Sequence, residues 1–191
     1  METQRITVWV TGPIKSTLDA YHDKCAKAQA NFIKAEIANG KEKKAARAEA
    51  ARVRPERWPT QDVLVTAAVC RYLQTPDLAG PWEPLTAVEL GQMRLAGRWP
   101  GPQIGGLVTE RQFGFPAEVV LQVRTASYRI SEPWLKQLKE EGLVGVKLDA
   151  EDRARRDTLA ANLVTPAQII RRALDQPFAL HRPGLIGTAT K

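Results

Sequence analysis

The chain repeats one short pattern of polar and apolar residues at two places about 120 residues apart. Arg5–Leu18 can be laid without a gap on Thr125–Leu138. Each has seven residues of alternating character, one further residue, a proline, a large apolar residue and a leucine five positions after the proline. Period-2 alternation is typical of a strand with one buried face, and a proline just inside the next segment is typical of a helix start. The pattern predicts strands at 4–11 and 124–131, each leading directly into a helix.

A second pair of segments favours an internal repeat. Thr60–Val69 aligns with Thr165–Leu174, 105 residues further along the chain. Both threonines can cap a helix, because a hydroxyl oxygen accepts a hydrogen bond from an unpaired amide of the first turn, and Pro166 occupies the favoured first helical position. This separation differs from the 120 residues of the first pair, so the alternative is that short segments match by chance.

These patterns predict a mainly α fold with short β-strands. The predicted helices span about 13–37, 41–53, 60–73, 86–96, 133–141, 150–161 and 166–175. Asn39-Gly40 is expected to end the first helix, Pro55 and Pro59 to close the second, and Thr86 with Glu89 to form a capping box.

Four regions follow from these patterns. A first half with a long basic helical insertion covers 1–75, and a second strand-helix-helix half covers 121–180. Between them, prolines and glycines interrupt 76–120, which we interpret as an ordered but irregular connecting segment. The last residues, 181–191, are expected to form a mobile tail.

Composition favours a polyanionic partner and argues against several other classes. The 28 Lys and Arg against 21 Asp and Glu give a net charge of +7. Two cysteines and two histidines cannot supply a clustered zinc site, so we expect no metal and two reduced, partly buried thiols. No apolar run approaches a membrane span, and the charged first residues are unlike a signal peptide, so we expect a cytoplasmic protein.

No catalytic pattern stands out in the sequence. Three serines lie outside any nucleophile-elbow pattern and have no histidine close by: Ser16, Ser127 and Ser131. The glycine-rich segment 101–106 lacks the Gly-Lys-Ser/Thr of a phosphate-binding loop. We therefore expect neither an enzyme nor a cofactor.

A strand of alternating polarity followed by two helices resembles the ribbon-helix-helix family of DNA-binding proteins, the Arc and MetJ type. Arg5–Ala20 is similar to that family's strand and first helix, and Val164–Leu174 is similar to its second helix. The resemblance implies that two strands pair antiparallel into a ribbon that enters the major groove, while the second helices hold phosphates at their N-termini. It also implies a homodimer, or a pseudo-dimer within one chain.

The sequence departs from that family in the connection between the helices. The family joins its two helices by a brief turn, whereas here 24–59 would be an insertion. An alternative register places the second helix at 28–37, but Ala26 and Ala28 favour a continuous helix there instead of a turn.

The resemblance assigns base reading to the outward faces of the two predicted strands. Apolar Ile6, Val8 and Val10 would point inward in the first strand. The outward residues, and so the predicted base-reading set, are Arg5, Thr7, Trp9, Thr125, Ser127 and Arg129. Arginine can make a bidentate contact to guanine, and threonine or serine can bond to several bases. The alternative is an ordinary half-exposed strand whose polar side chains face water.

Phosphate binding is predicted at the helix starts and along a basic stretch. The helix-start residues are Thr60, Gln61 and Thr165. Between Lys41 and Arg57, seven basic residues oppose three acidic ones, and those closest to its start are Lys41, Lys43, Lys44 and Arg47. The alternative for this stretch is a solvated, alanine-rich helix.

The sequence is therefore interpreted as a DNA-binding protein, either a transcriptional repressor or an accessory factor in plasmid or phage DNA processing, with double-stranded DNA as its partner. One alternative is a protein-interaction module without nucleic acid. Its interface would use the aromatic residues Trp82, Trp99, Phe113, Phe115 and Trp134. A small enzyme of another type is the remaining alternative.

Overall fold

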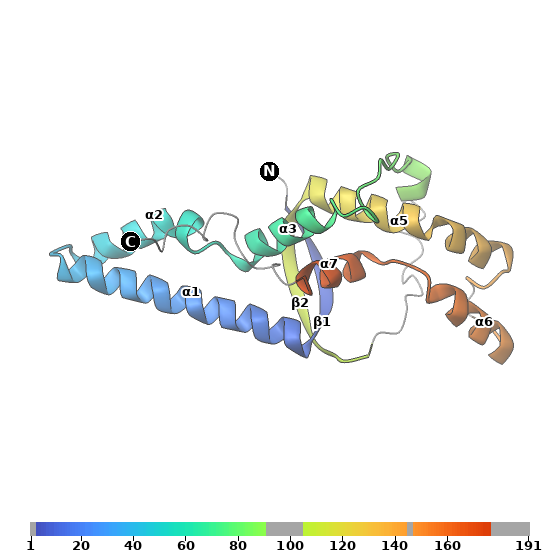
Figure 1. Ribbon diagram of the computed structural model, residues 1–191, viewed down its shortest axis with the longest axis horizontal. Coiled ribbons are helices and arrows are strands. Elements are labelled where there is room, and N and C mark those ends of the chain that lie inside the picture. The colour runs from blue at the N-terminus through green and yellow to red at the C-terminus, as the bar shows by residue number, and fades with distance from the viewer. Residues whose placement is uncertain (1–2, 91–104, 145–146, 177–191) are drawn as a thin grey trace.

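The computed structural model describes residues 3–90, 105–144 and 147–176, and it is mainly helical with one two-stranded antiparallel sheet (Figure 1). In chain order the elements are β1 (Thr3–Thr11), α1 (Gly12–Ala38), α2 (Lys43–Arg57), α3 (Gln61–Tyr72), β2 (Leu107–Pro116), α5 (Ala117–Glu140), α6 (Ala150–Ala160) and α7 (Pro166–Leu174). None of the helices in these parts of the chain is long and apolar enough to cross a membrane.

The molecule is elongated, with the sheet near its middle. Figure 1 shows a hairpin of α1 and α2 on one side and the pair α5 and α6 on the other, while α3 and α7 lie across the strands. Helices α3 and α7 pack against each other, α3 also packs on β2, and α7 packs on β1. The core therefore lies between the sheet and these two short helices.

The first helix forms as its local sequence predicts. Pro13 lies in its first turn, where its missing amide costs no helical hydrogen bond. The helix ends at Asn39-Gly40, as predicted: Gly40 adopts a left-handed φ of 88°, and the amide of Lys41 bonds back to the carbonyl of Glu36 at 3.1 Å.

The second helix is longer than predicted. The expectation that Pro55 closes it is wrong, because α2 continues through this proline to Arg57. The last turn is held by tertiary contacts to α1: the Trp58 ring meets Phe32 edge-on at 5.5 Å, and the Arg57 guanidinium lies 5.2 Å from the same Phe32 ring. Packing here outweighs the cost of a proline in the final turn.

The predicted strand 124–131 is wrong, because this segment is the middle of helix α5, and Pro133 lies inside that helix. Its seven alternating residues are too few to separate a strand from a buried helix. Over the whole helix one row of buried positions recurs at helical spacing: Val119, Val123, Ser127, Ser131, Leu135 and Leu138. The longer helical period decides the structure.

The partner of β1 is β2, at 107–116, inside the segment predicted to be irregular. Phe113 and Phe115 alternate inward as in any half-buried strand, but Gly114 between them obscures the pattern. A Cβ at Gly114 would lie 3.0 Å from Oδ2 of Asp62 in α3, a tight contact, so the close approach of α3 favours glycine there.

Pairing of β1 with β2 shows the repeat at a single separation of 105 residues. Thr7 lies opposite Gln112, its own counterpart 105 residues further on, so an approximate two-fold axis through this pair relates the two strands. The same separation relates Gly12 to Ala117 at the helix starts, and Thr60 to Thr165 at the caps. The 120-residue alignment is therefore wrong, and the second half begins at β2 instead of at 121.

The buried positions of the two halves correspond. Residues that are buried in both members of a pair are Val8 and Phe113, Val10 and Phe115, Ile14 and Val119, Leu18 and Val123, Leu64 and Ile169, Val65 and Ile170, Ala68 and Ala173, and Val69 and Leu174. Among the elements of the described residues, β1 is followed by α1, α2 and α3, and β2 is followed by α5, α6 and α7. The two halves thus share this order and one core.

Candidate nucleic-acid interface

The sheet has one covered face and one open face. On the inner face, Val8, Val10, Phe113 and Phe115 are buried against the helices. The outer face consists of exposed side chains, and we call it the ribbon face: Thr3, Arg5, Thr7, Trp9, Val108, Glu110 and Gln112.

The prediction that Arg5, Thr7 and Trp9 point outward is confirmed. All three are exposed, and Trp9 exposes 49% of its surface, which is unusual for such a large aromatic side chain. Nη1 of Arg5 donates to Oε1 of Gln112 across the strands at 3.0 Å. The ribbon face therefore combines hydrogen-bond donors, acceptors and one apolar surface, although reading of bases by these residues stays a prediction.

The second predicted base-reading set is wrong. Thr125 and Ser127 lie on α5 with only 8% and 5% of their surfaces exposed. Oγ of Ser127 donates to the carbonyl of Val164 at 2.6 Å, which ties α5 to the segment before α7. Helical rather than extended backbone turns these side chains into the core.

Arg129 does not lie on the ribbon face either, because it bonds to the chain segment that follows α3. Its guanidinium makes two hydrogen bonds to the Glu89 carboxylate, 2.7 Å from Nη1 to Oε1 and 3.1 Å from Nη2 to Oε2. It also donates to the backbone carbonyls of Glu83 and Pro84. Arg129 is thus a structural residue that joins two parts of the chain.

Glu89 has two further bonding partners in the predicted capping box. Its carboxylate accepts the Thr86 amide at 2.6 Å, while the Glu89 amide donates to Oγ1 of Thr86 at 3.2 Å. The predicted box is present, although residues 91–96 of the predicted helix lie outside the described residues. The hydrogen bond from Arg129, and secondarily that from Thr86, lowers the pKa of Glu89 to about 2.

Replacing Glu89 by glutamine is expected to lower the melting temperature at pH 7. The folded state lowers the pKa of Glu89, so the carboxylate contributes stability above its unfolded pKa of about 4.5, and this contribution is lost as the pH falls toward about 2. The difference in melting temperature between wild type and Glu89→Gln should therefore shrink across that range. Glu140→Gln, at a largely exposed position, is the control, and a gap that stays constant with pH would contradict the assignment.

The predicted phosphate-binding helix starts are well-formed caps. Oγ1 of Thr60 accepts from the Val63 amide, and Oγ1 of Thr165 accepts from the Gln168 amide. Nε2 of Gln61 donates to the carbonyl of Leu18 at 2.9 Å, so this side chain is already engaged.

The two helix starts differ in charge. Asp62 lies in the first turn of α3, and no acidic residue lies in the first turn of α7. A carboxylate at a helix start competes with an anionic ligand for the same amides. The start of α7 is therefore the more favourable of the two for an anion, and phosphate binding at either start stays a prediction.

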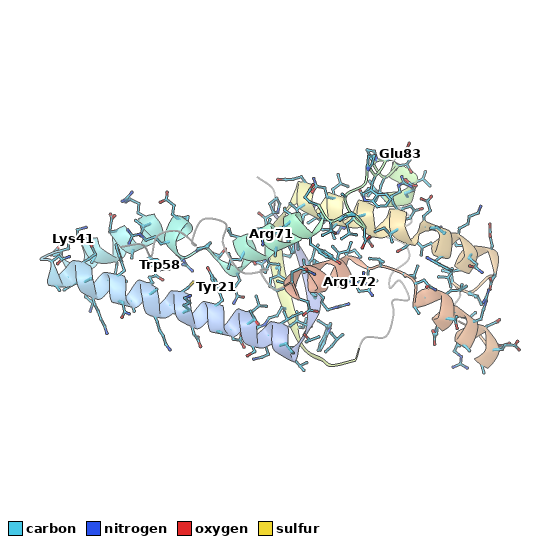
Figure 2. All side chains as sticks on the ribbon, in the orientation of Figure 1. Tyr21, Lys41, Trp58, Arg71, Glu83 and Arg172 are labelled. Carbon is cyan, nitrogen blue, oxygen red and sulfur yellow. The ribbon has the colours of Figure 1, made fainter. Side chains whose placement is uncertain are left out.

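The predicted basic stretch runs along α2 and begins at the far end of the α1–α2 hairpin. Figure 2 shows Lys41 at this tip, far from the sheet, and α1 has 27 residues, which corresponds to a length of roughly 40 Å. Lys41 is paired with Glu36, and this hydrogen bond raises the pKa of Lys41. Lys43, Lys44 and Arg47 are exposed and make no ion pair among the described residues.

A basic residue on β2 is not available to a ligand on the ribbon face. Arg111 points toward the helices, where its Nη2 lies 2.6 Å from Oδ1 of Asp19 on α1. Hydrogen bonding from Lys15 is the main cause that lowers the pKa of Asp19, and the charge of Arg111 adds to it. Arg111 therefore contributes to the junction between β2 and α1.

One hollow of about 320 Å³ lies between α1, the end of α2 and the start of α3. Its lining includes His22, Cys25, Arg54, Trp58 and Asp62. The basic Arg54 and the acidic Asp62 both line it, so the hollow does not present a site of one charge. Cys25 and Cys70 are both half-buried and free, as predicted.

The aromatic interface predicted for a protein-interaction module is only partly present. Phe113 and Phe115 are buried in the core and cannot contact a partner. Nε1 of Trp82 donates to the carbonyl of Leu78, Trp134 packs against a second cluster of buried residues, and Trp99 lies outside the described residues. The four described residues do not form one surface.

Sequence reasoning missed Glu110 and Gln112, the polar residues of β2 on the ribbon face. The signal that could have found them is the 105-residue separation of the two capped helices, which, applied to the strands, places 108–116 beside 3–11. No protein-family model, no curated protein and no solved structure matches this chain.

Proposed function

We propose that this chain binds double-stranded DNA by placing the β1–β2 ribbon in the major groove, as an intramolecular counterpart of the ribbon-helix-helix arrangement. One observation carries the proposal: a two-stranded antiparallel ribbon has an exposed polar face, while its other face is covered by two threonine-capped helices that pack against each other. A two-stranded ribbon has the width that the major groove admits.

The side chains of the ribbon face suit base edges. Arg5 can donate to both acceptors of guanine, and Gln112 and Thr7 can donate and accept. Trp9 offers an apolar surface of the kind that contacts a thymine methyl group. Net charge of +7 favours approach to the phosphate backbone.

The approximate two-fold axis through Thr7 and Gln112 also supports the proposal. Duplex DNA has local two-fold axes in its grooves, and ribbon readers align their own symmetry with these axes. In this chain both halves come from one polypeptide, so a single copy supplies a complete ribbon. A repressor or an accessory factor in DNA processing is the role that such binding serves best.

A fluorescence-anisotropy titration tests the proposal. The full chain is titrated against a labelled duplex of random sequence at 50 and 200 mM salt, because release of counterions makes DNA binding weaken steeply with salt. Binding that falls by about tenfold or more between the two conditions supports DNA as the partner. No binding at the lower salt concentration would exclude it.

Neutralising Lys43, Lys44 and Arg47 together tests whether the α1–α2 hairpin binds phosphates. If it does, affinity for all duplexes falls alike, and the slope of log affinity against log salt becomes shallower by about 0.9 for each phosphate that the variant no longer neutralises. The matched control replaces Lys136, Lys147 and Arg153 in the other half, which changes the net charge equally. Equal slopes in the two triple variants would show that the hairpin is merely solvated.

A further inference from the structure

We infer that this chain binds DNA in a single orientation and that its preferred target is a non-palindromic duplex. The inference rests on the proposed function and deepens it. Its basis is that the two halves share a backbone arrangement but differ in chemistry at the related positions of the ribbon face.

The two ends of the ribbon face carry different groups. In the register of the sheet, Arg5 lies opposite Gly114, and Trp9 lies opposite Glu110. One end therefore presents a guanidinium beside a residue without a side chain, and the other presents an indole beside a carboxylate. The 105-residue separation makes Glu110 the counterpart of Arg5, so the approximate axis exchanges a cation for an anion.

At the end of the ribbon that carries Arg5, side-chain packing maintains this difference between the two ends. A Cβ at Gly114 would meet Oδ2 of Asp62 at 3.0 Å and Cγ2 of Thr3 at 3.2 Å. Gly114 is the counterpart of Trp9 at the 105-residue separation. It cannot therefore be replaced by a residue with a large side chain unless Asp62 and Thr3 move. The start of α3, with Asp62, lies beside this end of the ribbon.

The chemistry of each end selects a different base. Arg5 donates to the O6 and N7 acceptors of guanine, whereas the Glu110 carboxylate accepts from the N4 amino group of cytosine. On a palindromic site, the guanine that suits Arg5 in one half would recur in the other half and face Glu110. The acceptor atoms of the guanine and of the carboxylate would then repel each other. Binding to such a site would leave the Glu110 carboxylate desolvated and without a hydrogen-bond donor, which lowers the affinity.

The net charges of the α1–α2 hairpin and of the α5–α6 pair favour the same conclusion. Residues 12–57 contain 11 Lys and Arg against 6 Asp and Glu, a balance of +5, whereas the corresponding residues 117–162 contain 8 of each, a balance of zero. Figure 1 shows these two parts extending to opposite sides of the sheet. The protein therefore attracts the DNA phosphate backbone more strongly on one flank of the target than on the other.

The test is a selection of bound sequences from a library of duplexes with a randomised centre, using the full chain. The wild type is expected to select unequal half-sites. The selected duplex is then compared with two palindromes, each made by duplicating one of its halves. Each palindrome should bind about 5–150-fold more weakly, the range for one mismatched bidentate contact.

A charge reversal on the ribbon face gives an independent outcome. Glu110→Arg places an arginine at both related positions, so its selected sequence should become more symmetric, with guanine in both halves. Glu140→Arg makes the same charge change on the exposed surface of α5 and should leave the wild-type selection unchanged. Glu110→Gln, which removes the charge with little change in shape, should bind one palindrome better than the wild type does.

The failures of the two proposals can be told apart. A palindromic selection by the wild type, or equal affinity for the selected duplex and both palindromes, would overturn the single orientation and leave DNA binding intact. Retention of no duplex at all would overturn the proposed function, and the orientation with it.

Discussion

Replacing Ile170 by alanine is expected to lower the free energy of unfolding by about 2–5 kcal/mol and the melting temperature by roughly 4–20 °C. Ile170 is completely buried in the core that joins the sheet to α3 and α7. Truncation removes apolar contacts and leaves a cavity in a site that is enclosed by strands and helices from both halves. For a domain of ordinary stability, this decrease is a large part of the total.

Arg172→Ala is the matched control, because Arg172 lies in the same helix two residues later and is exposed. Its effect should be within about 0.5 kcal/mol, as for most surface substitutions. Thermal unfolding followed by far-UV circular dichroism measures both variants. Equal melting temperatures of the wild type and Ile170→Ala would mean that α7 does not pack on the sheet, and the shared core would have to be abandoned.

Replacing Arg5 by alanine is expected to weaken binding to the preferred duplex by about 1–3 kcal/mol, which corresponds to about 5–150-fold. The side chain is exposed, and its hydrogen bond to Gln112 is on the surface, so the fold should be unaffected. Binding to duplexes that lack the preferred sequence should change much less, because the substitution removes an interaction with a base and leaves the phosphate interactions in place. Anisotropy titrations with both kinds of duplex measure the difference.

The variant Arg129→Ala tests whether Arg129 differs in function from Arg5. The sequence patterns assigned base reading to both residues. The guanidinium of Arg129 is only 14% exposed and is bonded to Glu89, so this variant should melt at a lower temperature. Below that temperature it should keep the sequence preference of the wild type. If Arg5→Ala retained full sequence-specific affinity, or Arg129→Ala changed the preference, the ribbon face would not be the reading surface.

Where signals lie close together in the chain, the sequence alone determined the structure. The capped helices after Thr60 and Thr165, the end of α1 at Asn39-Gly40 and the outward face of β1 all depend on residues within a few positions of one another. Cap hydrogen bonds, the left-handed preference of glycine and period-2 alternation act locally. They can therefore be recognised without the rest of the molecule.

Tertiary structure decided which segment is the second strand. Seven alternating residues at 125–131 fit a strand and a buried helix equally, and only packing on both sides of α5 makes the helical period prevail. Conversely, Gly114 weakens the strand pattern of β2, yet a larger residue there would crowd Asp62 of α3. The residues within 125–131 and within 107–116 therefore do not by themselves identify the second strand.

The same limit applies to the candidate interface. Arg5 and Arg129 look alike in the sequence, each in a short stretch of alternating polar residues. One is exposed on the sheet and the other is bonded to Glu89, 40 residues away in the chain. A charged side chain is available to a ligand only if it stays exposed and no opposite charge within the protein neutralises it. Such charged partners are brought together by long-range packing, which the order of residues does not display.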